Sequence, residues 1–237
     1  NVRKEDCYII QPTGPSLNQT PNDNFMELLI LSDALKRGSA NSVNVVMPYY
    51  GYQRQDRKDY SRAPISAKVI ASCLEAQNIN RVIVFDLHAG QIQGFFSNRT
   101  PFDNLYVESN FINYIRNNNF DLANSIIISP DEGGMKRAVR VSNKLGIGMG
   151  TIYKERSEAN VVSKMSLMGN VENKVCIIVD DMIDTAGTAT KASKLLKEKG
   201  AKEIYMFACH GLFSGKALEN ISNSEFDKVI VTNTLNQ

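Results

Sequence analysis

The chain has 237 residues, of which 43% are hydrophobic and 22% are charged, and its formal net charge at pH 7 is +2. This is the balance of a soluble globular protein with room for one large domain or two small ones. The near-neutral charge argues against nucleic-acid and membrane partners, and no apolar run approaches the roughly 20 residues of a membrane span.

Strand-like and helix-like patterns alternate along the whole chain. Short apolar runs typical of buried strands lie at residues 6–11, 43–49, 81–87, 124–130, 147–153, 174–180, 203–209 and 228–233. Apolar residues recur at helical spacing at residues 25–35, 66–74 and 135–145, and again after residue 188. Such alternation predicts an α/β fold built mainly on parallel sheets.

A polar, proline-containing segment at residues 97–105 is the candidate domain boundary. It separates an expected domain at residues 1–105 from a second at residues 106–237. Each half has a strand that ends in an acidic turn, Phe85–His88 in the first half and Val179–Asp181 in the second. We therefore expect two related α/β halves.

The cysteines and the start of the chain bear on location and length. Neither metal-site nor disulfide-framework spacing occurs, and no signal-peptide pattern opens the chain, so we expect reduced thiols and a cytoplasmic protein. A strand pattern begins almost at once after Asn1, which is not an initiator Met, and we expect the protein to be longer than this chain. The four cysteines are Cys7, Cys73, Cys176 and Cys209.

An aromatic and basic loop follows the strand at residues 43–49. Tyrosine rings, here Tyr50 and Tyr52, suit stacking on a base, and guanidinium groups suit polyphosphate oxygens. Composition alone is equally compatible with a solvated surface loop, but tyrosines beside basic residues favour a nucleotide. The cations of this loop lie within nine residues and are Arg54, Arg57, Lys58 and Arg62.

Two further strands end in groups that bind ligands. Asp86 and His88 follow one strand, and Asp131 with the pair Gly133-Gly134 follows another. Open α/β sheets bind ligands at the carboxyl ends of their strands, and a glycine pair before a helix could admit a phosphate or a metal-bound water. A purely structural histidine is the alternative for His88, and the Asp131 turn is weak evidence by itself.

A basic segment follows the strand at residues 147–153. Lys154 and Arg156 stand just past that strand, and residues 157–160 are polar with no apolar face. The pattern predicts a mobile basic loop. Such a loop is usually only solvated, but beside a sugar-phosphate site it could close over a transferring phosphoryl group.

The most informative segment is residues 175–188. A buried strand ends on the carboxylates Asp180 and Asp181, and a turn with hydroxyls and a glycine then leads into a helix. Backbone N–H groups and the helix dipole make such a turn an anion site, while paired carboxylates suit vicinal sugar hydroxyls or a metal. An ordinary strand-to-helix turn is the alternative, but the combination predicts a receptor for a sugar phosphate. The turn residues are Asp184, Thr185, Ala186, Gly187 and Thr188.

This last segment resembles the ribose-phosphate loop of the type I phosphoribosyltransferase fold. Together with several other segments, the chain closely resembles the ribose-phosphate pyrophosphokinase family, also called phosphoribosyl pyrophosphate synthases. The segments that carry this resemblance are Pro48–Asp56, Ser61–Lys68, Asp86–Phe96, Ser129–Gly134, Lys154–Arg156, Val179–Thr188 and His210–Gly215.

The resemblance implies two similar domains of that fold, each a mainly parallel sheet flanked by helices. It also implies an enzyme of nucleotide biosynthesis that transfers the diphosphoryl group of ATP to the 1-hydroxyl of ribose 5-phosphate, giving phosphoribosyl pyrophosphate and AMP. In this chain it implies that Arg54, Gln55 and Arg62 bind ATP, that His88, Asp131 and Asp86 engage Mg²⁺, and that Lys154 and Arg156 are catalytic. Ribose 5-phosphate would be held by Arg156, Asp180, Asp181, Asp184, Thr185, Ala186, Gly187 and Thr188.

The family further implies a homo-oligomer, commonly a hexamer. Two alternatives remain. A non-catalytic regulatory subunit of the synthase would carry disruptions in the catalytic and ribose-phosphate loops, whereas Lys154, Arg156 and the acidic residues are present here. A phosphoribosyltransferase would lack the tyrosine-rich loop and the Asp86–Ala89 segment.

Overall fold

The structure is a computed structural model that describes every residue except 17, 159–160 and 237, and the side chains of residues 154–164 are also outside the description. The chain divides into two compact units. Unit 1 comprises Asn1–Tyr106 and Asn233–Gln237, and unit 2 comprises Val107–Thr232. Among the helices of the described residues, none is both long and apolar enough to cross a membrane.

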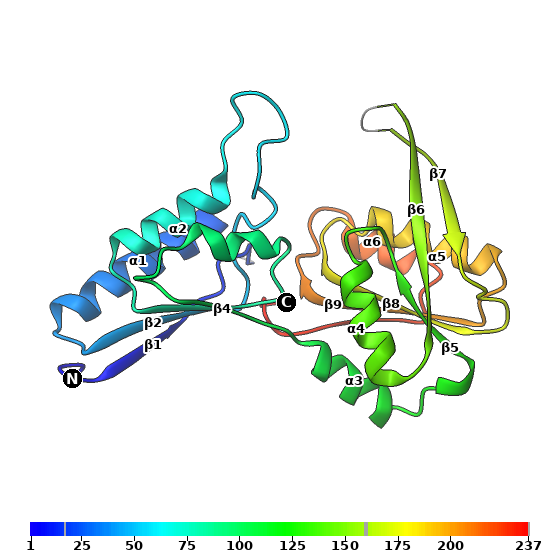
Figure 1. Cartoon of the computed structure of the whole chain (residues 1–237), viewed down its shortest axis with the longest axis horizontal. Coiled ribbons are helices and arrows are strands. Elements are labelled where there is room, and N and C mark those ends of the chain that lie inside the picture. The colour runs from blue at the N-terminus through cyan, green and yellow to red at the C-terminus, as the bar shows by residue number, and fades with distance from the viewer. Residues whose placement is uncertain (17, 159–160, 237) are drawn as a thin grey trace. The chain divides into compact units, whose positions relative to one another are not determined.

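Unit 1 is a parallel four-stranded sheet with helices on one face (Figure 1). Its strands pair in chain order. The helices pack their apolar faces on the sheet, and Leu28, Ile70 and Leu74 meet Val45 and Val84 in a common buried cluster. The elements are β1 (Asp6–Ile10), α1 (Pro21–Arg37), β2 (Ser42–Met47), α2 (Ser66–Ala76), β3 (Arg81–Phe85), the 3-10 helix η1 (Gly90–Phe95) and β4 (Phe102–Leu105).

Local sequence explains where α1 begins. Thr20 is its N-cap, Pro21 occupies the first helical position, and Asp23 and Thr20 form a reciprocal capping box. The hydrogen bonds from Thr20 lower the pKa of the Asp23 carboxyl. These contacts satisfy the backbone N–H groups that a helix start leaves without partners.

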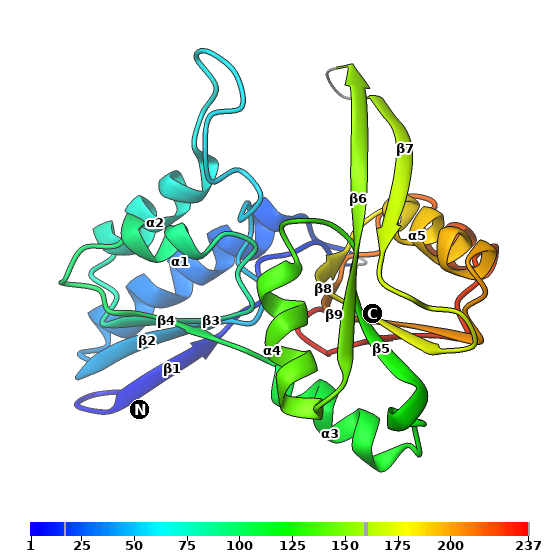
Figure 2. The ribbon, with the colours of Figure 1, turned by 45° about the vertical axis from the view of Figure 1, so that its right-hand side comes forward.

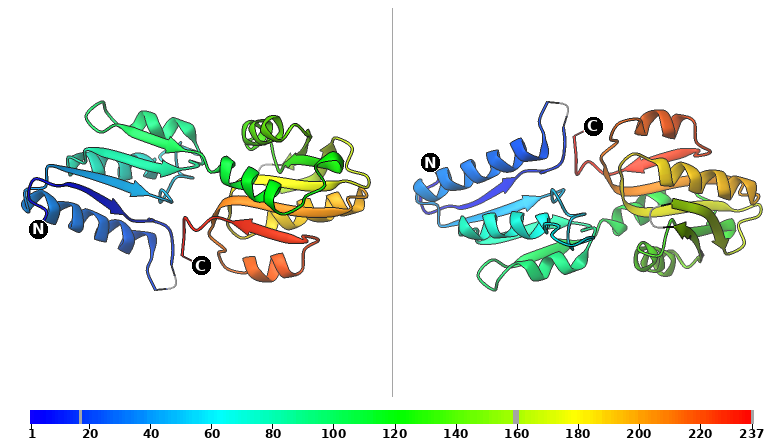
Figure 3. Two further views of the ribbon diagram at one scale, coloured as in Figure 1. Left: turned by 90° about the horizontal axis from the view of Figure 1, so that it is seen from below. Right: turned by 90° about the horizontal axis from the view of Figure 1, so that it is seen from above.

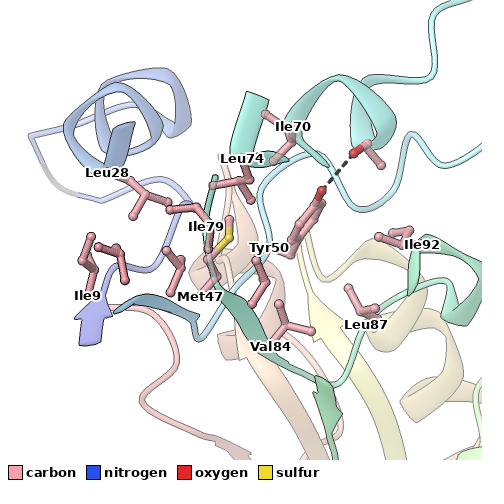
Figure 4. Close-up of a cluster of buried hydrophobic side chains, with 14 of the residues drawn as sticks. Ile9, Leu28, Met47, Tyr50, Ile70, Leu74, Ile79, Val84, Leu87 and Ile92 are labelled. Atoms are coloured by element: carbon pink, nitrogen blue, oxygen red, sulfur yellow. Dashed lines mark hydrogen bonds between the residues drawn. The ribbon is translucent and has the colours of Figure 1, made fainter. Parts of the chain in front are cut away.

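Tyr50 belongs to the core of unit 1 and is not available to a nucleotide base. Its side chain is fully buried, and its hydroxyl donates a 2.9 Å hydrogen bond to the carbonyl oxygen of Ala67 (Figure 4). Burial raises the pKa of this hydroxyl. The interpretation of Tyr50 as a base-stacking residue is therefore wrong. Tyr52 is only partly buried and is hydrogen-bonded to Asn22.

Unit 2 is a six-stranded sheet in the order β10-β9-β8-β5-β6-β7, parallel except for β7. Helices lie on both faces, with α4 and α5 on opposite sides (Figure 3). The elements are α3 (Glu108–Asn117), the 3-10 helix η2 (Leu122–Asn124), β5 (Ser125–Ser129), α4 (Met135–Leu145), β6 (Gly148–Glu158), β7 (Val161–Met168), β8 (Val175–Ile183), α5 (Gly187–Glu198), β9 (Glu203–Gly211), α6 (Ala217–Ser222) and β10 (Lys228–Val231).

Two apolar layers hold the unit 2 helices to the sheet. Alternate residues of β8 face opposite sides, so Cys176 and Ile178 join a buried cluster with Leu196 of α5. On the other side, Phe207 of β9 is fully buried and forms an edge-to-face ring contact with Phe111 of α3. The continuous apolar run that signals β8 in the sequence thus reflects a strand buried on both faces. The predicted α/β fold with mainly parallel sheets is confirmed.

The strand order of unit 2 reverses between β5 and β8. From β5 the chain passes through α4 to β6 on one side, and from β8 it passes through α5 to β9 on the other. β5 and β8 are themselves parallel neighbours, with Ile128 opposite Ile178 as their last paired residues. A crevice outside the carboxyl ends of two such strands is where open α/β sheets bind ligands.

Three features differ from the sequence-based expectation. Residues 102–105 form β4, although their polar sequence resembled a linker, because this short strand at the edge of the sheet needs no apolar run.

Lys154 and Arg156 lie within β6, which pairs with β7 in a hairpin that extends beyond the rest of unit 2 (Figures 1 and 2). The expected loop at 154–160 is therefore strand up to Glu158, and residues 159–160 lie outside the described part. Residues beyond Thr232 group with unit 1, where the buried Leu235 lies against Gly14.

Candidate functional site

Asp180 and Asp181 lie in β8, beyond the point where its neighbour β5 has ended. β8 continues to pair with β9 as far as Ile183, so only the β5 side of these residues is open. Asp181 is buried, whereas the side chain of Asp180 is 24% exposed. The Asp180 carboxylate accepts a 2.8 Å hydrogen bond from the backbone N–H of Asp181, which fixes the two acids relative to each other.

Arg137 of α4 partly offsets the negative charge of these two carboxylates. Its Nη1 atom lies 3.5 Å from Oδ1 of Asp180 and 3.9 Å from Oδ1 of Asp181. Burial of Asp180 and the negative charge of Asp181 raise the pKa of the Asp180 carboxyl, while Arg137 acts in the opposite direction. Arg137 was not among the predicted site residues. It lies 43 residues from Asp180 in the sequence, and no local pattern connects them.

The turn between β8 and α5 presents unused hydrogen-bond donors. Within the described residues, none of the backbone N–H groups of Thr185, Ala186, Gly187 and Thr188 donates a hydrogen bond. Ala186 adopts the left-handed conformation, with φ of 60°. A Cβ atom at Gly187 would meet only the Thr185 Oγ1 atom, 3.8 Å away, so there is space beside the turn. Donors at the start of a 12-residue helix with open space beside them form an anion site.

The turn after β5 is rigid and carries Asp131. The Asp131 carboxylate accepts a 3.1 Å hydrogen bond from the N–H of Gly134, and the Ser129 hydroxyl donates to the Asp131 carbonyl oxygen at 2.7 Å. A Cβ atom at Gly134 would lie 2.9 Å from Ser129 Oγ, so a side chain here would push the Ser129 hydroxyl out of its hydrogen bond with Asp131. Because β5 and β8 are neighbours, the turns that carry Asp131 and the Asp180–Asp181 pair leave adjacent strands.

In unit 1 the turn after β3 is held by three backbone contacts. The N–H groups of Asp86, Leu87 and His88 donate to the carbonyl oxygen of Leu105 at 2.8 Å, the Asn104 side chain at 3.1 Å and the Gln53 side chain at 2.9 Å, respectively. Gln53 is fully buried in the loop that precedes Arg54, and it therefore ties the two expected ATP- and metal-binding segments together. No local sequence pattern indicates this role of Gln53.

The expected ATP-binding residues are exposed. Arg54, Gln55 and Arg62 all lie on the long loop between β2 and α2, which projects from unit 1 (Figures 1 and 2). The N–H of Gln55 donates to Tyr52 and its carbonyl oxygen accepts from Ala67, so this part of the loop is anchored to α2. Lys154 and Arg156 belong to unit 2, and their side chains lie outside the described part. The roles of all five residues stay predictions.

The expected metal ligands are divided between the units. His88 is exposed, whereas Asp86 is only 3% exposed, so His88 is the more accessible of the two. Asp131 belongs to unit 2. The described residues contain no group of three or more His, Cys, Asp or Glu side chains that could hold a metal by themselves. The carboxylate oxygens of Asp86 and Asp131 suit Mg²⁺, which prefers oxygen ligands and is commonly bound by one or two carboxylates together with substrate phosphates and water.

Comparison with known proteins identifies relatives along almost the whole chain. Residues 1–77 match the family model described as the N-terminal domain of ribose phosphate pyrophosphokinase, and residues 158–237 match the phosphoribosyl synthetase-associated domain. The chain is 48% identical over 235 residues to ribose-phosphate pyrophosphokinase A of Dictyostelium discoideum, covering 99% of this chain and 72% of that protein. It is 49% identical over 236 residues to ribose-phosphate pyrophosphokinase of Campylobacter jejuni, covering 99% and 74% respectively.

A solved structure agrees with these matches. The phosphoribosylpyrophosphate synthetase of Mycobacterium smegmatis superposes with a TM-score of 0.88 at 38% identity. The similarity covers 99% of this chain and 74% of that chain. The likeness therefore extends over both units.

The repulsion between Asp180 and Asp181 has a measurable consequence for stability. A raised pKa means that ionised Asp180 destabilises the folded state, so Asp180→Asn should raise the melting temperature at neutral pH. We expect a rise of a few degrees, since about 1 kcal/mol shifts Tm by about 2–4 °C at this chain length. The gain should vanish below the ordinary carboxyl pKa, where aspartic acid is neutral in both states.

Scanning calorimetry at neutral and acidic pH tests this expectation. Glu132→Gln is the matched control, because it removes an exposed carboxylate from the Asp131 turn and should leave Tm unchanged. A loss of stability in Asp180→Asn at neutral pH would show that the ion pair with Arg137 outweighs the repulsion.

Proposed function

Because this chain belongs to the ribose-phosphate pyrophosphokinase family, we propose that unit 2 binds ribose 5-phosphate and unit 1 binds ATP in its reaction. The enzyme is a transferase of nucleotide biosynthesis that moves the diphosphoryl group of ATP to the 1-hydroxyl of ribose 5-phosphate. The products are phosphoribosyl pyrophosphate and AMP. The assignment of residues to these roles is ours.

The observation that carries the sugar-phosphate assignment is the set of N–H groups in the turn Thr185–Thr188, directly after two carboxylates. A dianionic 5-phosphate would accept from these N–H groups and from the hydroxyls of Thr185 and Thr188. Asp180 and Asp181 would accept hydrogen bonds from the ribose hydroxyls, because ionised carboxylates only accept. Asp184 would complete the turn.

The ATP assignment is supported by charge and exposure. Arg54 and Arg62 are exposed cations on the projecting loop of unit 1, and Gln55 is an exposed amide beside Arg54. Guanidinium groups bind phosphate oxygens through parallel hydrogen bonds, which suits a triphosphate. Since the ring of Tyr50 is buried, groups other than this ring would hold the base of ATP.

Lys154 and Arg156 would act in catalysis. Negative charge on the transferring phosphoryl group must be stabilised in the transition state, and fixed cations contribute most when water is excluded. The β6–β7 hairpin that carries both residues extends beyond the body of unit 2, as a catalytic flap requires. Arg156 would also contact ribose 5-phosphate. No convincing general base is present among the predicted site residues, and a desolvated sugar hydroxyl could react without one.

We further propose Mg²⁺ as the cofactor, engaged by His88 and Asp131 with Asp86 nearby. When bound, Mg²⁺ neutralises charge on the ATP phosphates. The protein groups themselves would orient the phosphates around it. Family membership also supports a homo-oligomer, which we expect to be a hexamer. We propose a cytoplasmic location for the enzyme.

The products of the reaction test the proposed function. The full-length protein with Mg²⁺, ATP and ribose 5-phosphate should release AMP and phosphoribosyl pyrophosphate, as chromatography of the nucleotides would show. Chelation of the metal should abolish AMP release. ADP as the product would contradict the proposal, because it would mean transfer of a single phosphoryl group. Pyrophosphate release with a nucleobase would indicate a phosphoribosyltransferase, and no turnover would favour a regulatory subunit.

The hairpin cations should matter for the chemical step. Lys154→Ala should lower kcat by about 10²-fold or more while changing ribose 5-phosphate binding much less, because one charge contact to the transition state is lost. Arg156→Ala should show a similar loss of kcat. The matched control is Lys191→Ala, which removes an exposed cation from α5. Steady-state kinetics measures these changes. An unchanged kcat in both variants would show that Lys154 and Arg156 do not act in catalysis.

A further inference from the structure

The turn Thr185–Thr188, here called the phosphate turn, can direct its N–H groups at a ligand only if residues outside the turn bind its carbonyl oxygens. Each peptide unit is planar and trans, so its C=O and N–H groups point in opposite directions. N–H groups that face a ligand therefore require their carbonyl oxygens to point back into the protein. Those oxygens need donors there, because a polar group turned away from water without a partner is costly.

The structure provides a donor behind each of the first three peptides of the turn. The carbonyl oxygen of Asp184 accepts from the N–H of Ser214 at 3.0 Å, and that of Ala186 accepts from the N–H and the hydroxyl of Thr190, both at 2.9 Å. Between them, the carbonyl oxygen of Thr185 accepts a 2.8 Å hydrogen bond from the side-chain amide of Asn220. Asn220 is the only one of these donors that reaches the turn through a side chain of another helix.

The bond from Asn220 acts on the most strained point of the turn. The carbonyl of Thr185 and the N–H of Ala186 belong to one peptide unit, so fixing the first directs the second. Ala186 has a φ of 60°, a left-handed conformation that is unfavourable for a residue with a Cβ atom. Rotation of this peptide unit would relieve that conformation, and it would also turn the N–H of Ala186 away from the ligand.

The helix that carries Asn220 is itself fixed to unit 2. Ala217, at the start of α6, is fully buried in the same apolar cluster as Leu196 of α5. The carbonyl oxygen of Asn220 lies 3.2 Å from the Thr190 hydroxyl, which gives a second link between α6 and the first turn of α5. Asn220 is thus held at a constant distance behind the phosphate turn.

We propose that Asn220 is a positioning residue for ribose 5-phosphate: it holds the Thr185–Ala186 peptide so that the N–H groups of the turn face the 5-phosphate. This inference rests on the proposed function of the turn. Asn220 does not touch the phosphate, and it acts through the backbone of Thr185. Its contribution is specific to the phosphorylated sugar, since ATP is bound by unit 1.

Substitution of Asn220 should change the binding of one substrate only. Asn220→Ala should raise the dissociation constant and the KM for ribose 5-phosphate by about 3- to 10-fold, the effect of losing one hydrogen bond. The KM for ATP and the melting temperature should stay nearly unchanged. Asn220→Asp should raise the dissociation constant and the KM for ribose 5-phosphate further, because it lacks the donor and adds a negative charge behind the phosphate site. Asn220→Gln keeps the donor and should fall between the wild type and Asn220→Ala.

Asn223→Ala is the matched control. Asn223 has the same side chain three residues further on, at the C-cap of α6, it is exposed, and its side chain makes no hydrogen bond within the described residues. This variant should bind ribose 5-phosphate as the wild type does. Titration calorimetry with ribose 5-phosphate alone, together with steady-state kinetics, provides both readouts.

The possible outcomes distinguish a failure of the positioning role of Asn220 from a failure of the proposed reaction. Equal ribose 5-phosphate affinity in Asn220→Ala and wild type would overturn the positioning role, as would an equal loss in Asn223→Ala or an equal rise in the KM for ATP. Wild-type protein that binds ribose 5-phosphate but releases no AMP would contradict the reaction, while the ratio of dissociation constants would still decide the role of Asn220. Wild-type protein that binds no ribose 5-phosphate would contradict both.

Discussion

The parallel pairing of β5 with β8 is the constraint on which the proposed ribose 5-phosphate site depends. It makes neighbours of two strands whose following helices, α4 and α5, cover opposite faces of the sheet. The turns after these strands diverge, and the edge between them is left open. Because β5 ends at Ser129 while β8 continues to Ile183, Asp180 and Asp181 have no β5 residue paired beside them.

Negative charge at this edge is partly offset by a cation from a neighbouring helix. Two adjacent carboxylates would repel both each other and a nearby phosphate, and α4 supplies Arg137 against them. The same helix begins at the Gly133-Gly134 pair, so one element both shapes the Asp131 turn and brings the compensating charge. The N–H groups of the turn Thr185–Thr188 lie at the start of a different helix, α5, whose dipole favours an anion. Attraction for the phosphate and acceptors for the sugar hydroxyls thus come from separate elements.

Sequence reasoning predicted those parts of the proposed site that are contiguous in the chain. The strand, the two carboxylates, the turn and the helix start follow one another in residues 175–188, so their spacing alone predicts the chemistry. Arg137 and Asn220 could not be found in this way, because they reach the site from 43 and 35 residues away, respectively. Such contacts depend on which helix packs behind which turn. A single sequence does not encode that in any local pattern.

The errors in the fold also have physical reasons. Tyr50 lies four residues before Arg54 in the sequence, but its ring is buried in the core of unit 1, where the carbonyl oxygen of Ala67 accepts a hydrogen bond from its hydroxyl. β4 and β7 lie at the edges of their sheets, where strands need no continuous apolar run, so neither showed a strong pattern. Central strands such as β5 and β8 were recognised because burial on both faces requires apolar residues throughout.

A crystal structure of the protein with bound ribose 5-phosphate would test the central claim most directly. The account predicts phosphate oxygens at about 2.7–3.2 Å from the backbone nitrogens of Thr185–Thr188, with the ribose hydroxyls on Asp180 and Asp181. A phosphate bound elsewhere, with these N–H groups left to water, would contradict it.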